Sequence, residues 1–222
     1  MIKTIKLLIS GYEASGKSTI ASKIENALVI NFDKKEYNFA IPHADFKEYT
    51  GMASVLNFVN EKITKYKEVY GEFPKFIIFD TVTQLYSAMT RHNSNKFTGF
   101  NIHSQNNTDT LDFNSYIEDF LIPNGMSIVI VAHTKPDEAS GRHIIPAQGQ
   151  FRDAGSWLSV VNDAIFIEKA SGKLNVFFRS FKYPARTTIK DIQEKIPVEE
   201  FDINEYLKTL TNSKTQADKF AL

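Results

Sequence analysis

The stretch GYEASGKST, residues 11–19, follows directly on the apolar run IKLLIS at residues 5–10 and decides the fold. Gly11, four free positions and then Gly16, Lys17 and Ser18 form the frame of a phosphate-binding loop (P-loop), which joins a strand to a helix. In such a loop backbone N–H groups turn inward around the phosphates, the lysine neutralises the β- and γ-phosphates, and the serine hydroxyl ligates Mg²⁺. We therefore expect ATP and Mg²⁺ as cofactors. The candidate nucleotide-binding residues here are Gly11, Ala14, Ser15, Gly16, Lys17, Ser18 and Thr19.

The run KFIIFD, which ends at Asp80, supplies a second part of a nucleotide site. An acidic residue at the tip of an apolar strand can hold Mg²⁺ as the Walker-B carboxylate does, so Ser18 and Asp80 are the predicted metal ligands. An Asp in this place can instead cap the helix that DTVTQL begins. Because Thr81 follows Asp80, a catalytic carboxylate must come from elsewhere or be missing.

Two acidic residues follow the apolar run ALVINF and are candidates for that carboxylate. Asp33 and Glu36 leave the second predicted strand beside the P-loop, where a carboxylate could orient the attacking water. The alternative for both is a solvated turn. Asp33 is the predicted catalytic residue of the pair.

The run SIVIVAH ends at His133, and we expect this strand beside the one that ends at Asp80. A polar side chain at that tip can hydrogen-bond the γ-phosphate and report its presence to the segment that follows. A purely structural histidine is the alternative. Lys135 lies in the same segment and can simply be solvated.

Composition describes an ordinary globular protein of 222 residues with 26 basic and 26 acidic side chains. Because the net charge is zero, any contact with nucleic acid should be local rather than spread over a basic surface. The absence of cysteine excludes disulfides and thiolate metal sites and fits a cytoplasmic setting. The apolar stretch at the start is too short for a membrane span, so we expect no membrane association.

The order of apolar and polar segments predicts an α/β fold with a mainly parallel central sheet. The predicted organisation is a core over residues 1–200, followed by a C-terminal helix and flexible tail over 201–222. Continuous apolar runs of strand length lie at residues 5–10, 27–32, 75–80 and 127–133, and residues 163–169 and 173–181 read as a β-hairpin.

Helical patterns lie between these strands, and two long polar segments interrupt them. We expect helices over residues 17–27 and 113–121, and a third on the apolar stripe from Met52 to Tyr66. Residues 91–107 and 134–150 are predicted to form loops, and loops of this length are often functional.

Together GYEASGKS, IIFDTVTQL, IVIVAHTK and GQFRDAGSWLSVVNDAIFIEK resemble the RecA-like ATPase core over roughly residues 3–185. Without a large flanking domain, the chain looks most like the small phage-encoded RecA-core ATPases of recombination and single-strand annealing. The resemblance implies a DNA-dependent ATPase in the host-cell cytoplasm, with slow hydrolysis because Asp33 stands in for the longer glutamate of the family. His133 likewise replaces the sensor glutamine. The resemblance assigns the nucleotide and Mg²⁺ roles to Gly16, Lys17, Ser18 and Asp80.

RecA-like assemblies hold ATP between subunits, so the resemblance also implies self-association into a ring or filament. Basic residues at the end of the last strand, Arg179, Lys182 and Arg186, match the trans-acting fingers of related DnaB-like helicases, and Lys182 and Arg186 are the predicted catalytic pair. They can equally be basic residues on an exposed strand end.

The two long segments fall where the family places its DNA-binding loops, so single-stranded DNA is the expected partner, with other replication or recombination proteins as further candidates. Cations mixed with aromatic residues suit such a site. Alternatives are a hexameric helicase, a nucleotide-gated binding protein with little turnover, and a small-molecule kinase. A kinase would require a lid with several arginines, whereas the second segment contains only Arg142. The candidate DNA-binding residues are Arg91, Lys96, Phe97 and Phe100 in the first segment and Lys135 and Arg142 in the second.

Overall fold

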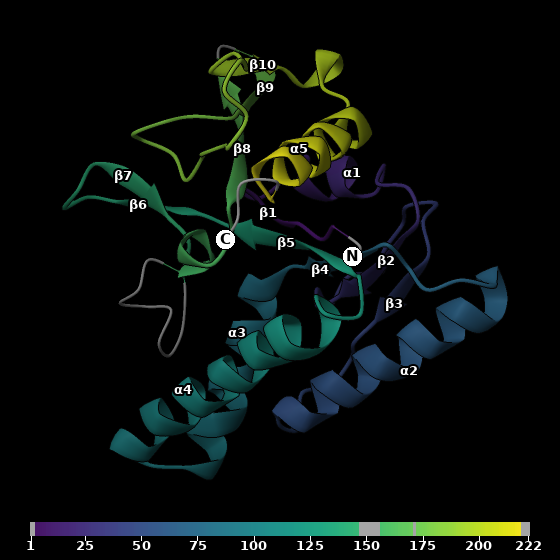
Figure 1. The fold of residues 1–222 in the computed structure, drawn as a ribbon. Coiled ribbons are helices and arrows are strands. Elements are labelled where there is room, and N and C mark those ends of the chain that lie inside the picture. Colours follow the sequence, from purple (N-terminus) through teal and green to yellow (C-terminus); the bar gives the residue numbers. More distant parts are fainter. Residues whose placement is uncertain (1–2, 147–155, 171, 219–222) are drawn as a thin grey trace.

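The computed structural model describes residues 3–146, 156–170 and 172–218, and its centre is a sheet of eight strands in the order β10-β9-β8-β1-β5-β4-β2-β3 (Figure 1). The six strands from β8 to β3 run parallel to one another. At the other end of the sheet, β9 is antiparallel to β8, and β10 is antiparallel to β9. The strands are β1 (Lys6–Gly11), β2 (Ala27–Asn31), β3 (His43–Asp45), β4 (Phe76–Asp80), β5 (Ser127–His133), β8 (Asp163–Ala170), β9 (Lys173–Phe177) and β10 (Lys195–Pro197).

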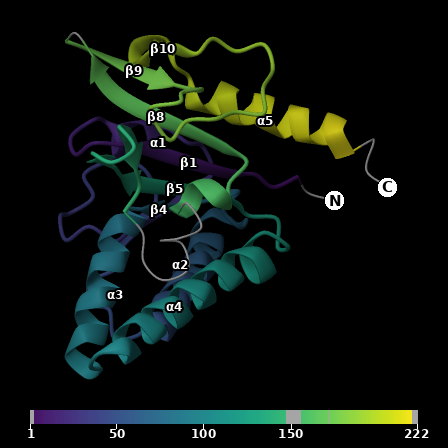
Figure 2. The same cartoon turned by 90° about the vertical axis from the view of Figure 1, so that its left-hand side faces the viewer.

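Helices cover both faces of the sheet, which explains why its inner strands are apolar along their whole length. Figure 2 shows α5 on one side and α2, α3 and α4 on the other. The helices are α1 (Lys17–Ala21), α2 (Met52–Tyr70), α3 (Val82–Lys96), α4 (Phe100–Ser115) continued by the π-helical η1 (Tyr116–Leu121), the 3₁₀ turns η3 (Ser156–Ser159) and η4 (Val198–Glu200), and α5 (Ile203–Asp218). No helix in these ranges is long and apolar enough to cross a membrane.

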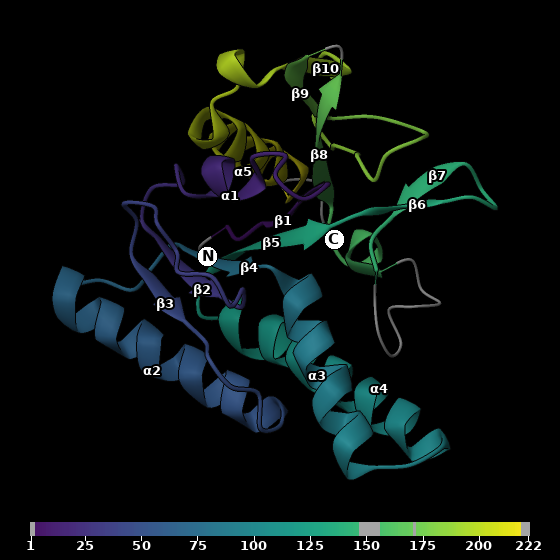
Figure 3. The ribbon, with the colours of Figure 1, turned by 180° about the vertical axis from the view of Figure 1, so that it is seen from behind.

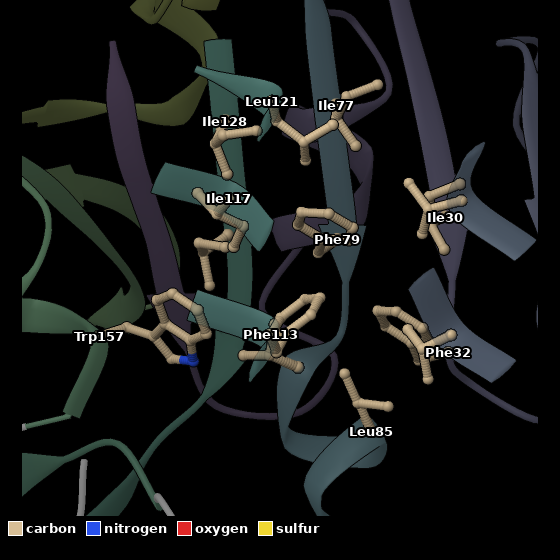
Figure 4. Close-up of a cluster of buried hydrophobic side chains, with 14 of the residues drawn as sticks. Ile30, Phe32, Ile77, Phe79, Leu85, Phe113, Ile117, Leu121, Ile128 and Trp157 are labelled. Atoms are coloured by element: carbon tan, nitrogen blue, oxygen red, sulfur yellow. The ribbon is translucent and has the colours of Figure 1, made fainter. Parts of the chain in front are cut away.

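The larger core layer lies between the sheet and helices α2, α3 and α4 (Figure 4). Phe113 packs edge-on against Phe79 of β4, with ring centroids 5.0 Å apart, and against Trp157 at 5.9 Å. The apolar stripe predicted from Met52 to Tyr66 faces this layer, so the prediction of α2 is confirmed. The four predicted central strands and the 163–181 hairpin are confirmed as well.

The prediction of a loop over residues 91–107 is wrong. The segment forms the end of α3, a short turn and most of α4, which together make a helical hairpin that projects from the sheet (Figure 3). Its polar residues satisfy one another in the interior. The buried amide of Asn93 donates to Asn106 Oδ1 and to Asp109 Oδ2, both at 2.8 Å, and Tyr49 also donates to Asp109.

Two other predictions need correction. The helix after the P-loop ends at Ala21, because the chain must turn there to begin β2 at Ala27. Residues 135–144 form a two-stranded ribbon, β6 (Lys135–Asp137) and β7 (Arg142–Ile144), rather than an irregular loop.

The C-terminal helix, predicted within residues 201–222, packs on the core. Its apolar residues pack with β1 and α1 in the second core layer, and the helix runs to Asp218 where a frayed tail was expected. The buried residues of α5 are Ile203, Tyr206, Leu207 and Leu210.

Candidate nucleotide-binding site

The strand order brings the predicted site residues to one edge of the sheet. β5 lies between β1 and β4, so His133 is level with Gly11, while Asp80 is level with Val131 on one side and Asn31 on the other. The carboxyl ends of these parallel strands therefore meet, as ligand sites in open α/β sheets require.

Backbone geometry explains the glycines of the P-loop. A Cβ at Gly11 would lie 2.5 Å from the carbonyl oxygen of Ile167 and 2.6 Å from Ser15 Oγ, so β1 can approach β8 this closely only without a side chain. Gly16 has φ +87°, in the left-handed region that favours glycine, and directly precedes α1.

Lys17 and Asp80 lie at the bottom of the site. The ammonium group of Lys17 is buried and donates to the Tyr12 carbonyl and, at 3.4 Å, to Ser15 Oγ. Burial lowers the pKa of Lys17 to about 8, and the charges of Asp80 and Glu13 limit that fall. Burial raises the pKa of Asp80, against the opposing influence of the Ser18 hydroxyl and the Lys17 charge.

One unsatisfied oxygen of Asp80 fits a Mg²⁺ ion with its water shell. Asp80 is 3% exposed, and its Oδ2 has no hydrogen-bond partner among the described residues. The same holds for the buried hydroxyls of Thr81 and Tyr37. Oxygen atoms of this kind are the ligands that Mg²⁺ prefers, directly or through water. Ser18 and Asp80 would hold the ion, which would shield the charge of the phosphates.

A cavity of about 550 Å³ joins these groups. It unites Lys17 and Asp80 with three further residues predicted from sequence, namely Asp33, Glu36 and His133. The other lining residues are Glu13, Ala14, Ser15, Gly16, Ser18, Thr19, Asn31, Lys35, Tyr37, Phe39, Thr81 and Gln84. Of the predicted nucleotide-binding residues, Gly11 alone does not line the cavity.

His133 is half-buried between the P-loop strand and the strand of Asp80. Its backbone N–H donates to Thr83 Oγ1 at 3.0 Å, which ties the tip of β5 to α3. Burial, with the charge of Lys17, lowers the pKa of His133, which favours the neutral imidazole.

The segment after β2 is held by the buried side chain of Asn31. The amide of Asn31 donates to the Lys35 carbonyl at 2.9 Å and to Asp45 Oδ1 at 2.8 Å, and its oxygen accepts the N–H of Asp33 at 3.0 Å. Asp33 is thereby fixed at the mouth of the cavity, where a carboxylate can act on a water molecule.

Two of the three basic residues predicted to reach a neighbouring subunit form hydrogen bonds within their own chain. The guanidinium of Arg186 donates to the carbonyls of Leu158 and Val161, and that of Arg179 donates to two carbonyls at 189–190. Lys182 is exposed beside Tyr183, its ammonium 5.2 Å from the ring centroid. Lys182 is therefore the finger candidate that is better placed to reach a second subunit.

The predicted DNA-binding residues divide between two projections of the fold. Arg91, Lys96, Phe97 and Phe100 belong to the α3–α4 hairpin, in which Phe100 is 81% exposed at the first position of α4. Lys135 and Arg142 are exposed on the β6–β7 ribbon, which begins two residues after His133. Both projections leave the sheet on the same side (Figures 1 and 3).

Sequence reasoning missed several lining residues, of which Asn31, Tyr37 and Gln84 are the most informative. Gln84 lies one helical turn beyond the strand that ends at Asp80, and this spacing could have identified it. Tyr37 lies in a polar stretch, and only its closeness to Asp80 in space reveals it.

Comparison with known proteins supports this geometry. A family model described as an AAA domain matches residues 3–145, which include the P-loop, Asp80, His133 and the β6–β7 ribbon. No curated protein matches the chain.

Proposed function

We propose that this chain, which belongs to the AAA-domain family of nucleotide-binding P-loop ATPases, is a RecA-like, Mg²⁺-dependent ATPase that acts on single-stranded DNA in recombination. The observation that carries the proposal is the single cavity that unites Lys17, Asp80, Asp33 and His133. P-loop, metal ligand, water-orienting carboxylate and γ-phosphate contact are the parts that ATP hydrolysis requires.

The link from nucleotide to DNA runs through β5. His133 is the last residue of β5 and lines the cavity, and the chain continues at once into the ribbon that carries Lys135 and Arg142. A change in the contacts of His133 on hydrolysis would be passed to the ribbon and alter its affinity for DNA. Self-association, with Lys182 reaching a neighbouring site, belongs to the same proposal.

ATP hydrolysis with and without a single-stranded oligonucleotide tests the core of the proposal. We expect DNA to stimulate turnover, and Lys17→Ala to remove nucleotide binding or turnover. Lys23→Ala is the matched control, because Lys23 is exposed and lies outside the cavity. Turnover that is unchanged in Lys17→Ala would refute the assignment of the site.

DNA binding is tested separately by titrating labelled oligonucleotide at increasing salt in the presence of ATP. Arg142→Ala should weaken binding and lower its salt dependence, whereas Lys208→Ala on α5 should not. Electron micrographs with ATP and DNA distinguish a filament or ring from a monomer. If DNA neither binds nor stimulates hydrolysis, the DNA part of the proposal is wrong even when the ATPase is active.

A nucleotide-gated binding protein with little turnover is the second candidate. It is favoured by the absence of a carboxylate directly after Asp80 and by the short side chain of Asp33. Tight ATP binding without hydrolysis, with or without DNA, would support it over the leading proposal.

A further inference from the structure

The segment that follows β2 brings a second lysine into the nucleotide cavity. Lys35 lines the cavity together with Asp33 and Glu36, whereas its neighbour Lys34 does not. No motif considered in the sequence assigns Lys35 a role.

The backbone of Lys35 is anchored, while its ammonium group is not committed. The carbonyl of Lys35 accepts the Asn31 amide at 2.9 Å, and its N–H donates to Asp33 Oδ1 at 3.4 Å. Among the residues that the structure describes, no hydrogen bond or ion pair is formed by the Lys35 ammonium group. An exposed cation fixed at its base and unpaired at its tip suits an anionic ligand.

Lys17 and Lys35 are the lysines among the described lining residues, and no arginine is among them. The ammonium of Lys17 is buried at the P-loop, and the guanidinium groups of Arg179 and Arg186 donate to carbonyls of their own chain. Lys35 and His133 line the same cavity, and the charge of Lys35, like that of Lys17, lowers the pKa of that imidazole.

We propose that Lys35 is a nucleotide-binding residue that contacts the terminal phosphate of ATP from within the same chain. The inference rests on the proposed nucleotide site and adds to it a phosphate contact in cis. A cation at the terminal phosphate favours the triphosphate over the diphosphate and stabilises charge on the transferring phosphoryl group.

The test compares Lys35→Ala with Lys34→Ala, because the two lysines are adjacent, both exposed, and only one lines the cavity. Affinities for fluorescent ATP and ADP analogues and steady-state turnover are measured for each. Loss of one charge-assisted contact should weaken ATP binding about tenfold or more. ADP binding should change little, Lys34→Ala should match the wild type, and Lys35→Arg should retain most of the ATP affinity.

Three results would overturn the inference: equal ATP affinity in Lys35→Ala and Lys34→Ala, an equal loss of ATP and ADP affinity, or recovery of turnover when Lys35→Ala is mixed with Lys17→Ala. The last result would mean that Lys35 acts on a neighbour's nucleotide. If the wild-type chain binds no ATP, the proposed function itself fails, and this outcome is distinct from the other three.

Discussion

The polar contact inside the α3–α4 hairpin allows a quantitative test of why this segment is helical. The amide of Asn93 is 2% exposed and donates two hydrogen bonds of 2.8 Å, one to Asn106 and one to Asp109. A buried amide–amide bond contributes about 1 kcal/mol and a bond to a carboxylate about 2 kcal/mol. Asn93→Ala should therefore lower the free energy of unfolding by about 3 kcal/mol.

The assay is urea unfolding followed by circular dichroism. With a slope of about 3 kcal/mol/M for a chain of this size, the midpoint should fall by about 1 M. Asn95→Ala is the matched control, because it removes an exposed asparagine from the same helix, and its midpoint should move by less than about 0.2 M. The double variant with Asp109→Ala should show a coupling energy of about 1–2 kcal/mol with Asn93→Ala.

Equal midpoints for Asn93→Ala and Asn95→Ala would refute the reasoning. Additive losses in the double variant would do so as well, because they would mean that the side chains contribute independently. Only the first of these results would mean that the hairpin owes its stability to apolar packing rather than to Asn93.

Two further predictions concern the phosphate loop and its neighbour on β7. Gly11→Ala should weaken ATP binding and lower the melting temperature, because the new Cβ would lie 2.5 Å from the Ile167 carbonyl oxygen. A variant with the melting temperature and ATP affinity of the wild type would contradict the close approach of the strands. Burial, with the charge of Lys182, lowers the pKa of His143 below its usual 6.5, so the unfolded chain takes up a proton first as pH falls below about 6.5, and stability should fall there. The drop in urea midpoint between about pH 8 and about pH 5.5 should be smaller in His143→Gln than in the wild type, and an equal drop would exclude this contribution.

The central strands and the nucleotide site could be predicted because their signals are local. Fully buried parallel strands require unbroken apolar runs, and the P-loop requires glycine at fixed positions, so both features are visible in short stretches. Polar residues at the ends of such runs meet in space because parallel strands end at the same edge. Asp80, Asp33 and His133 were found by this reasoning.

The hairpin of α3 and α4 could not be predicted in this way. Its asparagines suggest a solvated loop, but they bond one another across thirteen residues or more, and no local pattern reveals that pairing. The C-terminal helix is different. Ile203, Tyr206, Leu207 and Leu210 repeat at helical spacing, and that period could have predicted its burial against the sheet.

The position of β1 inside the sheet has a consequence for how the chain is made. This strand precedes the other described strands in the sequence, yet one of its two neighbours is β5, at residues 127–133, and the other is β8, which begins at Asp163. At about 5–20 residues per second, roughly 8–30 s separate Gly11 from Asp163 on the ribosome. During that time an apolar strand lacks both partners, and the P-loop lacks the wall that the backbone of Ile167 provides. A nucleotide that requires the complete P-loop can therefore stabilise the chain only after β5 and β8 have been made.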